Sequence, residues 1–285
     1  MPSALKPFGN VLSQIRNRRR YGLGSLCAGF ALAILWQAYK RMVRLPLMLT
    51  TWKGTLFLLE VDSITSSRFV YEQRPDERFV ETLAAFAGAS EDDVMFVDVG
   101  ANVGLYSVLL CRTFQHGVLF EPNPVAAAMA RRNLALNGVA DRFRLIDAAV
   151  GRAAGTVTVP IVAMPDPALR VRDGESGAGC LTVPMVALDA AVPNGAVVVK
   201  IDAEGFDADV IEGFAGAFAA RRVRVCLFEC HEETVLSRVL AAVEPRGYAV
   251  MDGPRRLLRA GGPRGRDLFV VRDDLMPAYM RAAGA

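Results

Sequence analysis

Short apolar runs alternate with stretches of helical periodicity along most of the chain. Strands are predicted where apolar runs stand, at residues 94–97, 118–120, 143–149, 197–201, 223–228, 248–251 and 267–271. Apolar positions three or four apart predict helices at residues 75–86, 123–136, 206–218 and 234–243. This alternation predicts an α/β fold with a doubly wound, mostly parallel sheet. The last two runs flank an Arg/Gly-rich segment, which predicts a closing antiparallel hairpin.

Other short strands are predicted at residues 56–61, 69–71, 156–161 and 181–188. The polar stretch 165–179 is predicted to be a long loop, and loops of this length often contact substrates. Together with the Arg-rich segment 255–266, it is expected to shape the choice of substrate.

The N-terminal region differs from the rest of the chain. Residues 22–39 carry no charge, and basic residues lie on both sides of them, including Arg18, Arg19, Lys40 and Arg41. Their length is at the lower limit for a membrane-spanning helix, and the flanking charges give no orientation. Two alternatives stay open: a membrane anchor or interfacial helix, and a helix packed on the main domain or on a partner subunit.

Composition excludes some classes of protein and partner. The net charge of +3 gives no sign of a nucleic-acid partner. The five cysteines are odd in number and scattered, which is typical of reduced thiols in a cytosolic protein. Cys226, Cys230 and His231 lie close together in the sequence, but no second pair of ligands completes a zinc site. No metal is predicted.

A glycine-rich turn follows the strand at residues 94–97. It has the pattern D-x-G-x-N-x-G, formed by Asp98, Gly100, Asn102 and Gly104, and a helix is predicted from residue 105. Glycine lets backbone approach a ligand closely, and the start of a helix offers free N–H groups. The turn is therefore predicted to hold a cofactor at the carboxyl end of its strand.

The glycine spacing separates two kinds of cofactor. A dinucleotide site needs G-x-G-x-x-G, but Asn102 and Leu105 stand where the second and third glycines belong. Glu121 ends the next strand, roughly twenty residues after Gly100, where an acid accepts hydrogen bonds from both ribose hydroxyls. The pattern favours a nucleoside without phosphates over NAD.

A second candidate site lies in residues 197–205, VVVKIDAEG. Lys200, Asp202 and Glu204 end an apolar strand, where charged groups are costly unless they are paired or used. Side chains alternate along a strand, so the three are expected to share one face. They are predicted to act in catalysis or binding, with a structural Lys200 salt bridge as the alternative. Glu229 and His231, just past the next strand, are further general-base candidates.

In combination, DVGANVG, FEPNP and KIDAEGF resemble class I S-adenosylmethionine-dependent methyltransferases, and more narrowly the FkbM-type family. The resemblance covers roughly residues 55–275. It implies a seven-stranded sheet with a C-terminal antiparallel hairpin. The methyltransferase domain is predicted at residues 51–285, after an N-terminal helical extension at residues 1–50 that lies outside the resemblance. The resemblance also implies methyl transfer from S-adenosylmethionine to oxygen, typically a hydroxyl of a sugar or glycan, or of a polyketide-like metabolite.

The resemblance assigns roles to individual positions. Those expected around the cofactor are Asp98, Gly100, Asn102 and Gly104 on the methionine side, Glu121 at the ribose, Asp147 near the adenine, and Asn123 as a further cofactor-binding residue. Those expected beside the sulfonium and the acceptor are Lys200, Asp202 and Glu204, with His231 as a further catalytic candidate.

Two functions from other classes remain as alternatives: a non-catalytic, membrane-associated binding or scaffolding module, and a nucleotide-dependent oxidoreductase. The expected location is the cytoplasm, either free or membrane-associated with the catalytic domain facing the cytoplasm. The acceptor and the oligomeric state are not specified by the sequence.

Overall fold

The structure is a computed structural model, and it describes residues 15–16, 18–61, 63–88, 93–160, 180–257 and 266–284. The predicted loop at residues 165–179 lies outside these ranges. The chain divides into two compact units, Met1–Glu77 and Arg78–Ala285. Residues 51–77, which the sequence assigned to the main domain, thus form a compact unit with the N-terminal segment.

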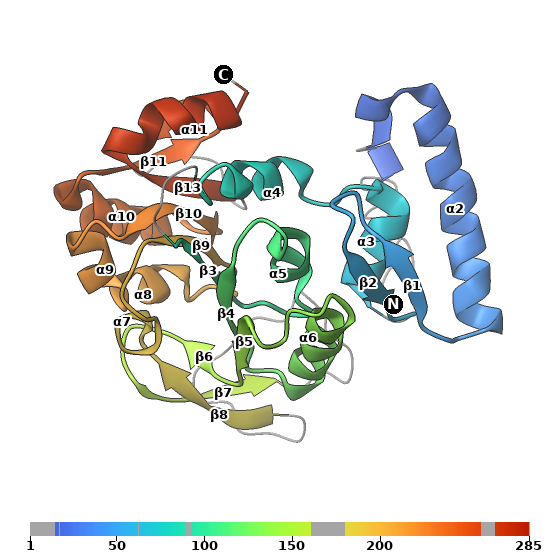
Figure 1. Ribbon diagram of the computed structural model, residues 1–285, viewed down its shortest axis with the longest axis horizontal. Coiled ribbons are helices and arrows are strands. Elements are labelled where there is room, and N and C mark those ends of the chain that lie inside the picture. The colour runs from blue at the N-terminus through green and yellow to red at the C-terminus, as the bar shows by residue number, and fades with distance from the viewer. Residues whose placement is uncertain are drawn as a thin grey trace. The chain divides into compact units, whose positions relative to one another are not determined.

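The first unit contains η1 (Arg18–Tyr21), α2 (Leu23–Met42), β1 (Leu47–Thr50), β2 (Leu56–Leu59) and α3 (Ile64–Glu72). Helix α2 packs along α3, and β1 pairs with β2 as an antiparallel hairpin (Figure 1). The strand predicted at residues 69–71 is wrong, because these residues lie in α3. Ser63 caps that helix by accepting a hydrogen bond from the Ser66 N–H, and the Phe69 ring packs at a tilt against Phe57 with ring centroids 4.7 Å apart.

The second unit is built on an eight-stranded sheet in the order β12-β11-β13-β10-β9-β3-β4-β5. The parallel strands are β3 (Met95–Val99), β4 (His116–Phe120), β5 (Phe143–Ile146), β9 (Val197–Ile201) and β10 (Val223–Cys230). Strand β13 (Arg266–Arg272) is antiparallel to both β10 and β11 (Tyr248–Asp252), as the predicted hairpin requires. The three-residue edge strand β12 (Arg255–Leu257) adds to the seven expected strands.

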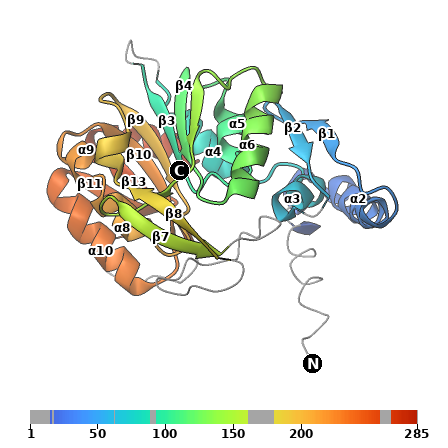
Figure 2. The same ribbon diagram turned by 90° about the horizontal axis from the view of Figure 1, so that it is seen from below.

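Helices cover both faces of this sheet (Figure 2). One face carries α5 (Leu105–Leu110) and α6 (Pro124–Leu136), and the other carries α8 (Asp207–Glu212), α9 (Ala215–Ala219) and α10 (Glu233–Val243). The remaining helices of this unit are α4 (Glu77–Ala84, which begins at the boundary), α7 (Leu188–Ala191), α11 (Met276–Ala282), η2 (Glu244–Arg246) and η3 (Asp273–Leu275). The helix predicted at residues 206–218 is interrupted between α8 and α9, near Gly213. A Cβ at Gly213 would lie 2.2 Å from the carbonyl oxygen of Gly151.

The predicted strand at residues 143–149 is divided in two. Strand β5 ends at Ile146, and β6 (Ala149–Val150) joins β8 (Cys180–Val186) and β7 (Gly155–Pro160) in a small separate sheet. The break places Asp147 in the connection between the two sheets.

Among the described residues, no helix has both the length and the apolar character that crossing a bilayer requires. Helix α2, which contains most of the uncharged stretch at residues 22–39, falls under this finding.

Candidate active site

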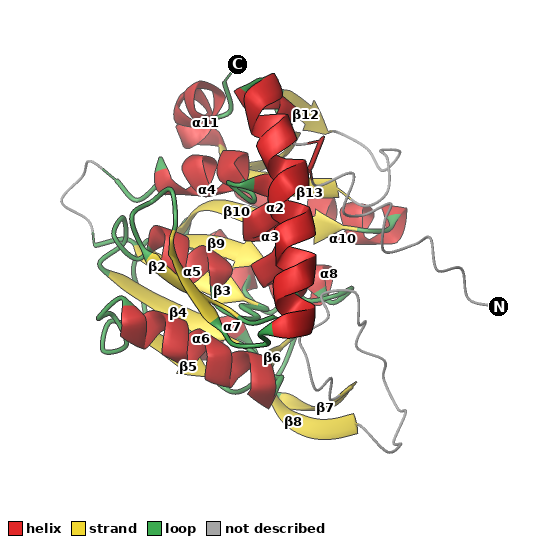
Figure 3. Cartoon of the chain, turned by 90° about the vertical axis from the view of Figure 1, so that its right-hand side faces the viewer, coloured by secondary structure: helices red, strands yellow, loops and turns green. Residues whose placement is uncertain are grey.

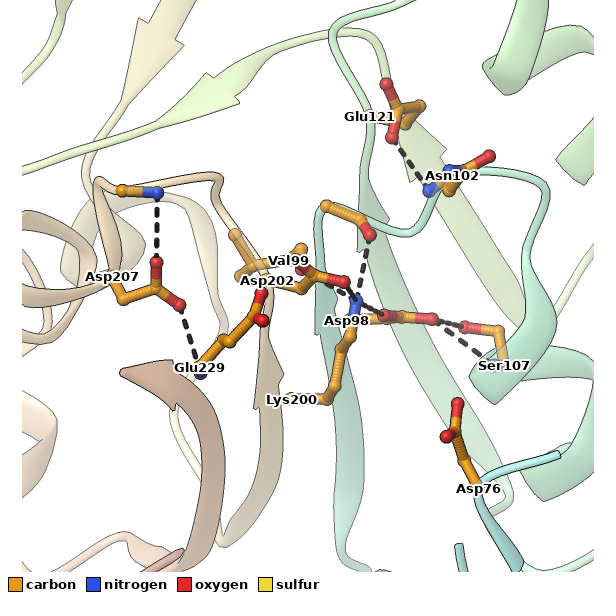
Figure 4. A network of polar contacts seen from close by, with 12 residues as sticks. Asp76, Asp98, Val99, Asn102, Ser107, Glu121, Lys200, Asp202, Asp207 and Glu229 are labelled. Atoms are coloured by element: carbon orange, nitrogen blue, oxygen red, sulfur yellow. Dashed lines mark hydrogen bonds and ion pairs between the residues drawn. The ribbon is translucent and has the colours of Figure 1, made fainter. Parts of the chain in front are cut away.

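The carboxyl ends of four neighbouring parallel strands bring the predicted site residues to one edge of the sheet (Figure 4). Strand β3 pairs with β9 so that Asp98 lies opposite Lys200, and it pairs with β4 so that Val99 lies opposite Phe120. The turn after β3, Glu121 after β4, Asp202 after β9 and Glu229 near the end of β10 therefore converge. Such an edge is where open α/β sheets bind ligands.

Beneath this edge lies a buried ion pair. Asp98 is fully buried, and its Oδ2 accepts hydrogen bonds from the N–H and Oγ of Ser107, at 3.2 and 2.7 Å. The Lys200 Nζ lies 3.7 Å from Asp98 Oδ1 and 3.4 Å from Asp202 Oδ2. Burial raises the pKa of Asp98, against the opposing effect of Lys200. Asp98 therefore holds α5 and Lys200 in place from within the core.

Lys200 also holds the glycine-rich turn. Its Nζ donates to the carbonyl oxygens of Gly100, at 2.9 Å, and Val99, at 3.4 Å. Burial alone would lower the pKa of Lys200, but the carboxylates of Asp202 and Asp98 reverse this and raise it. The residue is thus a fixed cation that links three strand ends.

Three residues of the turn have left-handed backbone: Gly100 at φ +67°, Asn102 at +50° and Gly104 at +81°. A Cβ at Gly100 would lie 1.9 Å from the carbonyl oxygen of Asp202, and one at Gly104 would lie 3.3 Å from the Cβ of Ala130 in α6. The sequence pattern predicts that these glycines let a ligand approach closely. In the structure both also allow close approach of the protein's own backbone and helices.

Glu121 is held at the edge by two backbone amides. Its side chain accepts from the N–H of Asn102 at 2.7 Å and from the N–H of Asn123 at 2.8 Å, and the residue is only 7% exposed. Burial raises the pKa of Glu121 to about 7, although both hydrogen bonds oppose the shift. Beside it, the buried Oδ1 of Asn102 has no hydrogen-bond partner within the described part of the chain. An acid and an unsatisfied acceptor thus lie together, and they fit the hydroxyl and amino donors of a nucleoside cofactor.

Two other residues predicted to bind the cofactor have structural partners. Asn123 caps α6, because its Oδ1 accepts from the N–H of Val125 at 2.9 Å. Asp147 follows β5 at the same edge, and its half-exposed carboxylate pairs with Arg131 at 2.6 Å. It is the main-chain N–H of Asn123 that donates to Glu121.

A group of carboxylates lies after β9. Asp202 is the open member, with a side chain 41% exposed and paired with Lys200. Glu204 has left-handed backbone at φ +48°, and burial, with Asp202 and Glu229 nearby, raises its pKa to about 8. Buried Asp207 accepts from the N–H groups of Gly205 and Glu229, at 3.4 and 3.3 Å, and burial raises its pKa to about 6. Sequence reasoning missed Asp207, although an acid at the first residue of a helix that follows a strand end was a usable signal.

The end of β10 supplies a second polar pair. The His231 Nε2 lies 3.0 Å from Glu229 Oε2. Burial and then Asp202 raise the pKa of Glu229, while His231 opposes the shift. The neighbouring Cys226 and Cys230 are buried free thiols. Within the described ranges, no group of three or more His, Cys, Asp or Glu side chains is placed to hold a metal ion.

The sheet is doubly wound, β13 runs antiparallel between β10 and β11, a glycine-rich turn follows β3, and Glu121 lies at the end of the neighbouring strand β4; this arrangement matches the class I methyltransferase fold. The chain belongs to the Methyltransferase FkbM domain family, which matches residues 98–250. Family membership agrees with the resemblance on which the sequence argument rested. It also supports the expected cofactor, S-adenosylmethionine.

Two curated relatives are similar to the chain. The hexuronic acid methyltransferase AglP of Haloferax volcanii is 28% identical over 213 residues, which cover 69% of this chain and 79% of that protein. Methyltransferase sdnD of Sordaria araneosa is 36% identical over 63 residues, 21% of this chain and 24% of that protein.

Solved structures are similar at lower identity. The methyltransferase FkbM of Methylobacillus flagellatus KT is 16% identical, with a TM-score of 0.46, over 71% of this chain and 51% of that one. The chain thus spans about half the length of that structure. M. jannaschii TYW2, solved in complex with AdoMet, is 16% identical with a TM-score of 0.40, over 79% of this chain and 84% of that one.

Proposed function

We propose that this methyltransferase transfers a methyl group to a hydroxyl oxygen of a sugar, a glycan or a polyketide-like metabolite. The observation that carries the proposal is the Asp202 carboxylate. It is partly exposed at the ligand edge of the sheet and is held 3.4 Å from the buried ammonium of Lys200. A hydroxyl acceptor must lose a proton during transfer, and a carboxylate at this edge can take it.

Glu121 and Asn102 hold the cofactor in this proposal. S-adenosylmethionine supplies an electrophilic methyl group on a sulfonium. Glu121 would accept hydrogen bonds from the ribose hydroxyls of the bound cofactor, because backbone amides already fix the position of both its oxygens. The free Oδ1 of Asn102 would accept from a second donor of the same molecule. Asp147, at the end of β5, would lie on the adenine side.

Asp202 and Glu204 have different tasks. The ammonium of Lys200 orients Asp202, which accepts the proton of the acceptor hydroxyl. Glu204, with its pKa raised to about 8, holds a proton at neutral pH and so donates a hydrogen bond to an acceptor oxygen. Asp202 and Glu204 thus have different roles, although the sequence pattern predicted the same role for both.

His231 is the second candidate for the general base. Its Nε2 is buried and lies 3.0 Å from Glu229 Oε2. Because the His231 Nε2 is buried, we assign proton removal to Asp202. The Glu229 and His231 pair positions the groups around Asp202.

The charge of the edge favours a neutral acceptor group. Burial and then Asp202 and Glu229 raise the pKa of Glu204, and a carboxylate entering beside Asp202 and Glu229 would meet the same like charge. One curated relative is named for a hexuronic acid, which supports a carbohydrate acceptor. On this sugar class the structure favours a ring hydroxyl over a carboxyl group as the methylated position.

The test is incubation with S-adenosylmethionine labelled in its methyl group and a glycan or metabolite pool, followed by mass spectrometry of the product. Label in a methyl ether supports the proposal, and label in a methyl ester or on nitrogen overturns it. Asp202→Asn should lower kcat about 10²- to 10⁴-fold while the cofactor still binds. Asp141→Asn, a change at an exposed turn, is the matched control.

The alternative functions are tested by calorimetry. Binding of S-adenosylmethionine without binding of NADH supports the proposal, and the reverse result would assign an oxidoreductase. If neither binds, the site is degenerate and the chain serves as a binding or scaffolding module.

A further inference from the structure

Exposed apolar side chains are concentrated in one short part of the chain. Among the described residues, ten of the eleven large hydrophobic side chains that are exposed lie between positions 23 and 48. They are Leu23, Phe30, Leu32, Ile34, Leu35, Met42, Val43, Leu45, Leu47 and Met48; the eleventh is Leu136. Such a concentration on one segment marks an interaction surface.

Helix α2 directs the polar groups of Trp36 and Gln37 inward, toward α3, which lies behind it in Figure 3. The Trp36 Nε1 donates to the Ser67 Oγ at 3.0 Å, and the Gln37 Nε2 donates to the Tyr71 hydroxyl at 2.6 Å. The buried ridge between these polar contacts consists of small or aromatic residues. The hydrogen-bonding groups of Trp36 and Gln37 are therefore used within the unit.

The outward side of α2 is almost entirely apolar. Ile34 is 72% exposed and Met42 is 83% exposed, and Leu35 lies between them on the same side. A surface helix in water has the opposite arrangement, with its polar face outward. The helix thus requires an apolar environment on its outer side.

The charge of the surrounding sequence indicates which environment this is. Nine Lys and Arg but no Asp or Glu precede Glu60, whereas the remaining 226 residues carry 24 Lys and Arg against 30 Asp and Glu. Arg41 and Arg44 are exposed at the end of α2, next to the apolar residues. Cations beside an apolar helix face complement anionic lipid headgroups above an acyl layer.

We infer that the outer face of α2 docks in the plane of an anionic lipid bilayer, with Ile34, Leu35 and Met42 entering the acyl boundary. The arginines at the end of the helix contact the headgroups. A second copy of the chain fits this face poorly, because the partner would bring the same excess of cations to it. Docking in the plane also agrees with the absence, in the described residues, of a helix able to cross. This inference does not depend on the methyl acceptor or on turnover.

The test is flotation of the full chain with phosphatidylcholine vesicles that contain or lack phosphatidylglycerol. The chain should float with the anionic vesicles, much less with the neutral ones, and less at high salt. Arg41→Gln and Arg44→Gln should each weaken binding roughly fivefold. Equal binding to both vesicle types, or binding to neither, would overturn the inference.

The apolar contribution is tested by Ile34→Glu combined with Leu35→Glu, which should abolish flotation. Leu136→Glu on α6 is the matched control, because it makes the same change at an exposed apolar residue in the other unit. Circular dichroism establishes that each variant is folded; should the double glutamate variant unfold, the arginine variants and the salt dependence still decide. A dimer that the glutamates dissociate, seen by light scattering without vesicle binding, would assign the face to a second copy and contradict the inference.

Discussion

The carbonyl oxygen of Asp202 occupies the space that a side chain at Gly100 would need. A Cβ built on Gly100 would lie only 1.9 Å from that oxygen. The contact joins the turn after β3 to the end of β9. The DVGANVG and KIDAEGF segments therefore touch each other through backbone atoms. Lys200 reinforces the junction by donating to the carbonyl oxygen of Gly100.

Gly100→Ala should lower the free energy of unfolding by about 3 kcal/mol and weaken cofactor binding, because it adds overlap to left-handed strain. Gly138→Ala is the matched control, since Gly138 has φ +64° but nothing within 4 Å of its added Cβ. Gly138→Ala should lower the free energy of unfolding by only about 1 kcal/mol, because it adds left-handed backbone strain but no overlap. Urea denaturation measures both. If both variants lost the same unfolding free energy, the ends of β3 and β9 would be able to move apart without loss of stability, which would contradict the prediction.

Lys200→Met should destabilise the protein by about 3–5 kcal/mol, because it leaves the buried carboxylate of Asp98 without its cation. The loss should be larger at pH 8 than at pH 5, since an unpaired buried carboxyl takes up a proton. Adding Asp98→Asn to Lys200→Met should recover part of the loss. A double-mutant cycle measured by urea denaturation checks this, and strictly additive changes would contradict the pairing.

Glu121→Gln should weaken binding of S-adenosylmethionine about 10- to 100-fold, because an amide replaces a charged acceptor. In the wild type, affinity should fall as the pH drops through about 7, where Glu121 takes up its proton, and the variant should lose this dependence. Asn123→Ala serves as control: it removes the cap of α6, at about 1 kcal/mol of stability, but keeps the N–H that Glu121 uses. Calorimetry across the pH range provides the measurement. Unchanged affinity in the glutamine variant would remove Glu121 from the cofactor site.

Glu204 should make the protein less stable as the pH rises from about 4.5 to about 8. Its folded pKa is raised to about 8 from an ordinary value of 4.5, so in this window the folded state holds a proton that the unfolded state has released. Glu204→Gln cannot ionise and should flatten the slope of unfolding free energy against pH in this window. Denaturation curves at several pH values test it; identical slopes in wild type and variant would show that Glu204 titrates normally.

Much of the sheet was predictable because continuous apolar runs predict buried parallel strands. The run at residues 197–201 and the run at 223–228 both became strands, and the order of charged strand ends followed from the topology. Arg255–Leu257 was not predicted as a strand, because two of its three residues are Arg and only pairing with β11 makes it extended. Residues 69–71 were misassigned because β propensity is overridden by the cap at Ser63.

The sequence predicted which residues form the site, but not the role of each residue in it. Glu121 and Asp202 could be placed at one edge from the strand pattern. The position of Asp98 inside the core could not, because it depends on Ser107 and on the lysine that arrives from a strand more than a hundred residues later. The inverted polarity of α2 was also hidden, since the partners of Trp36 and Gln37 come from α3.

The carboxylates gathered after β9 and β10 have a consequence for exchange of the spent donor. S-adenosylmethionine arrives with a positive sulfur, and the demethylated nucleoside that leaves carries none. We expect the anionic edge formed by Asp202 and Glu229 to attract the incoming molecule more strongly than the outgoing one. The same charges would thereby limit inhibition by the demethylated nucleoside and favour its replacement by a new molecule of S-adenosylmethionine.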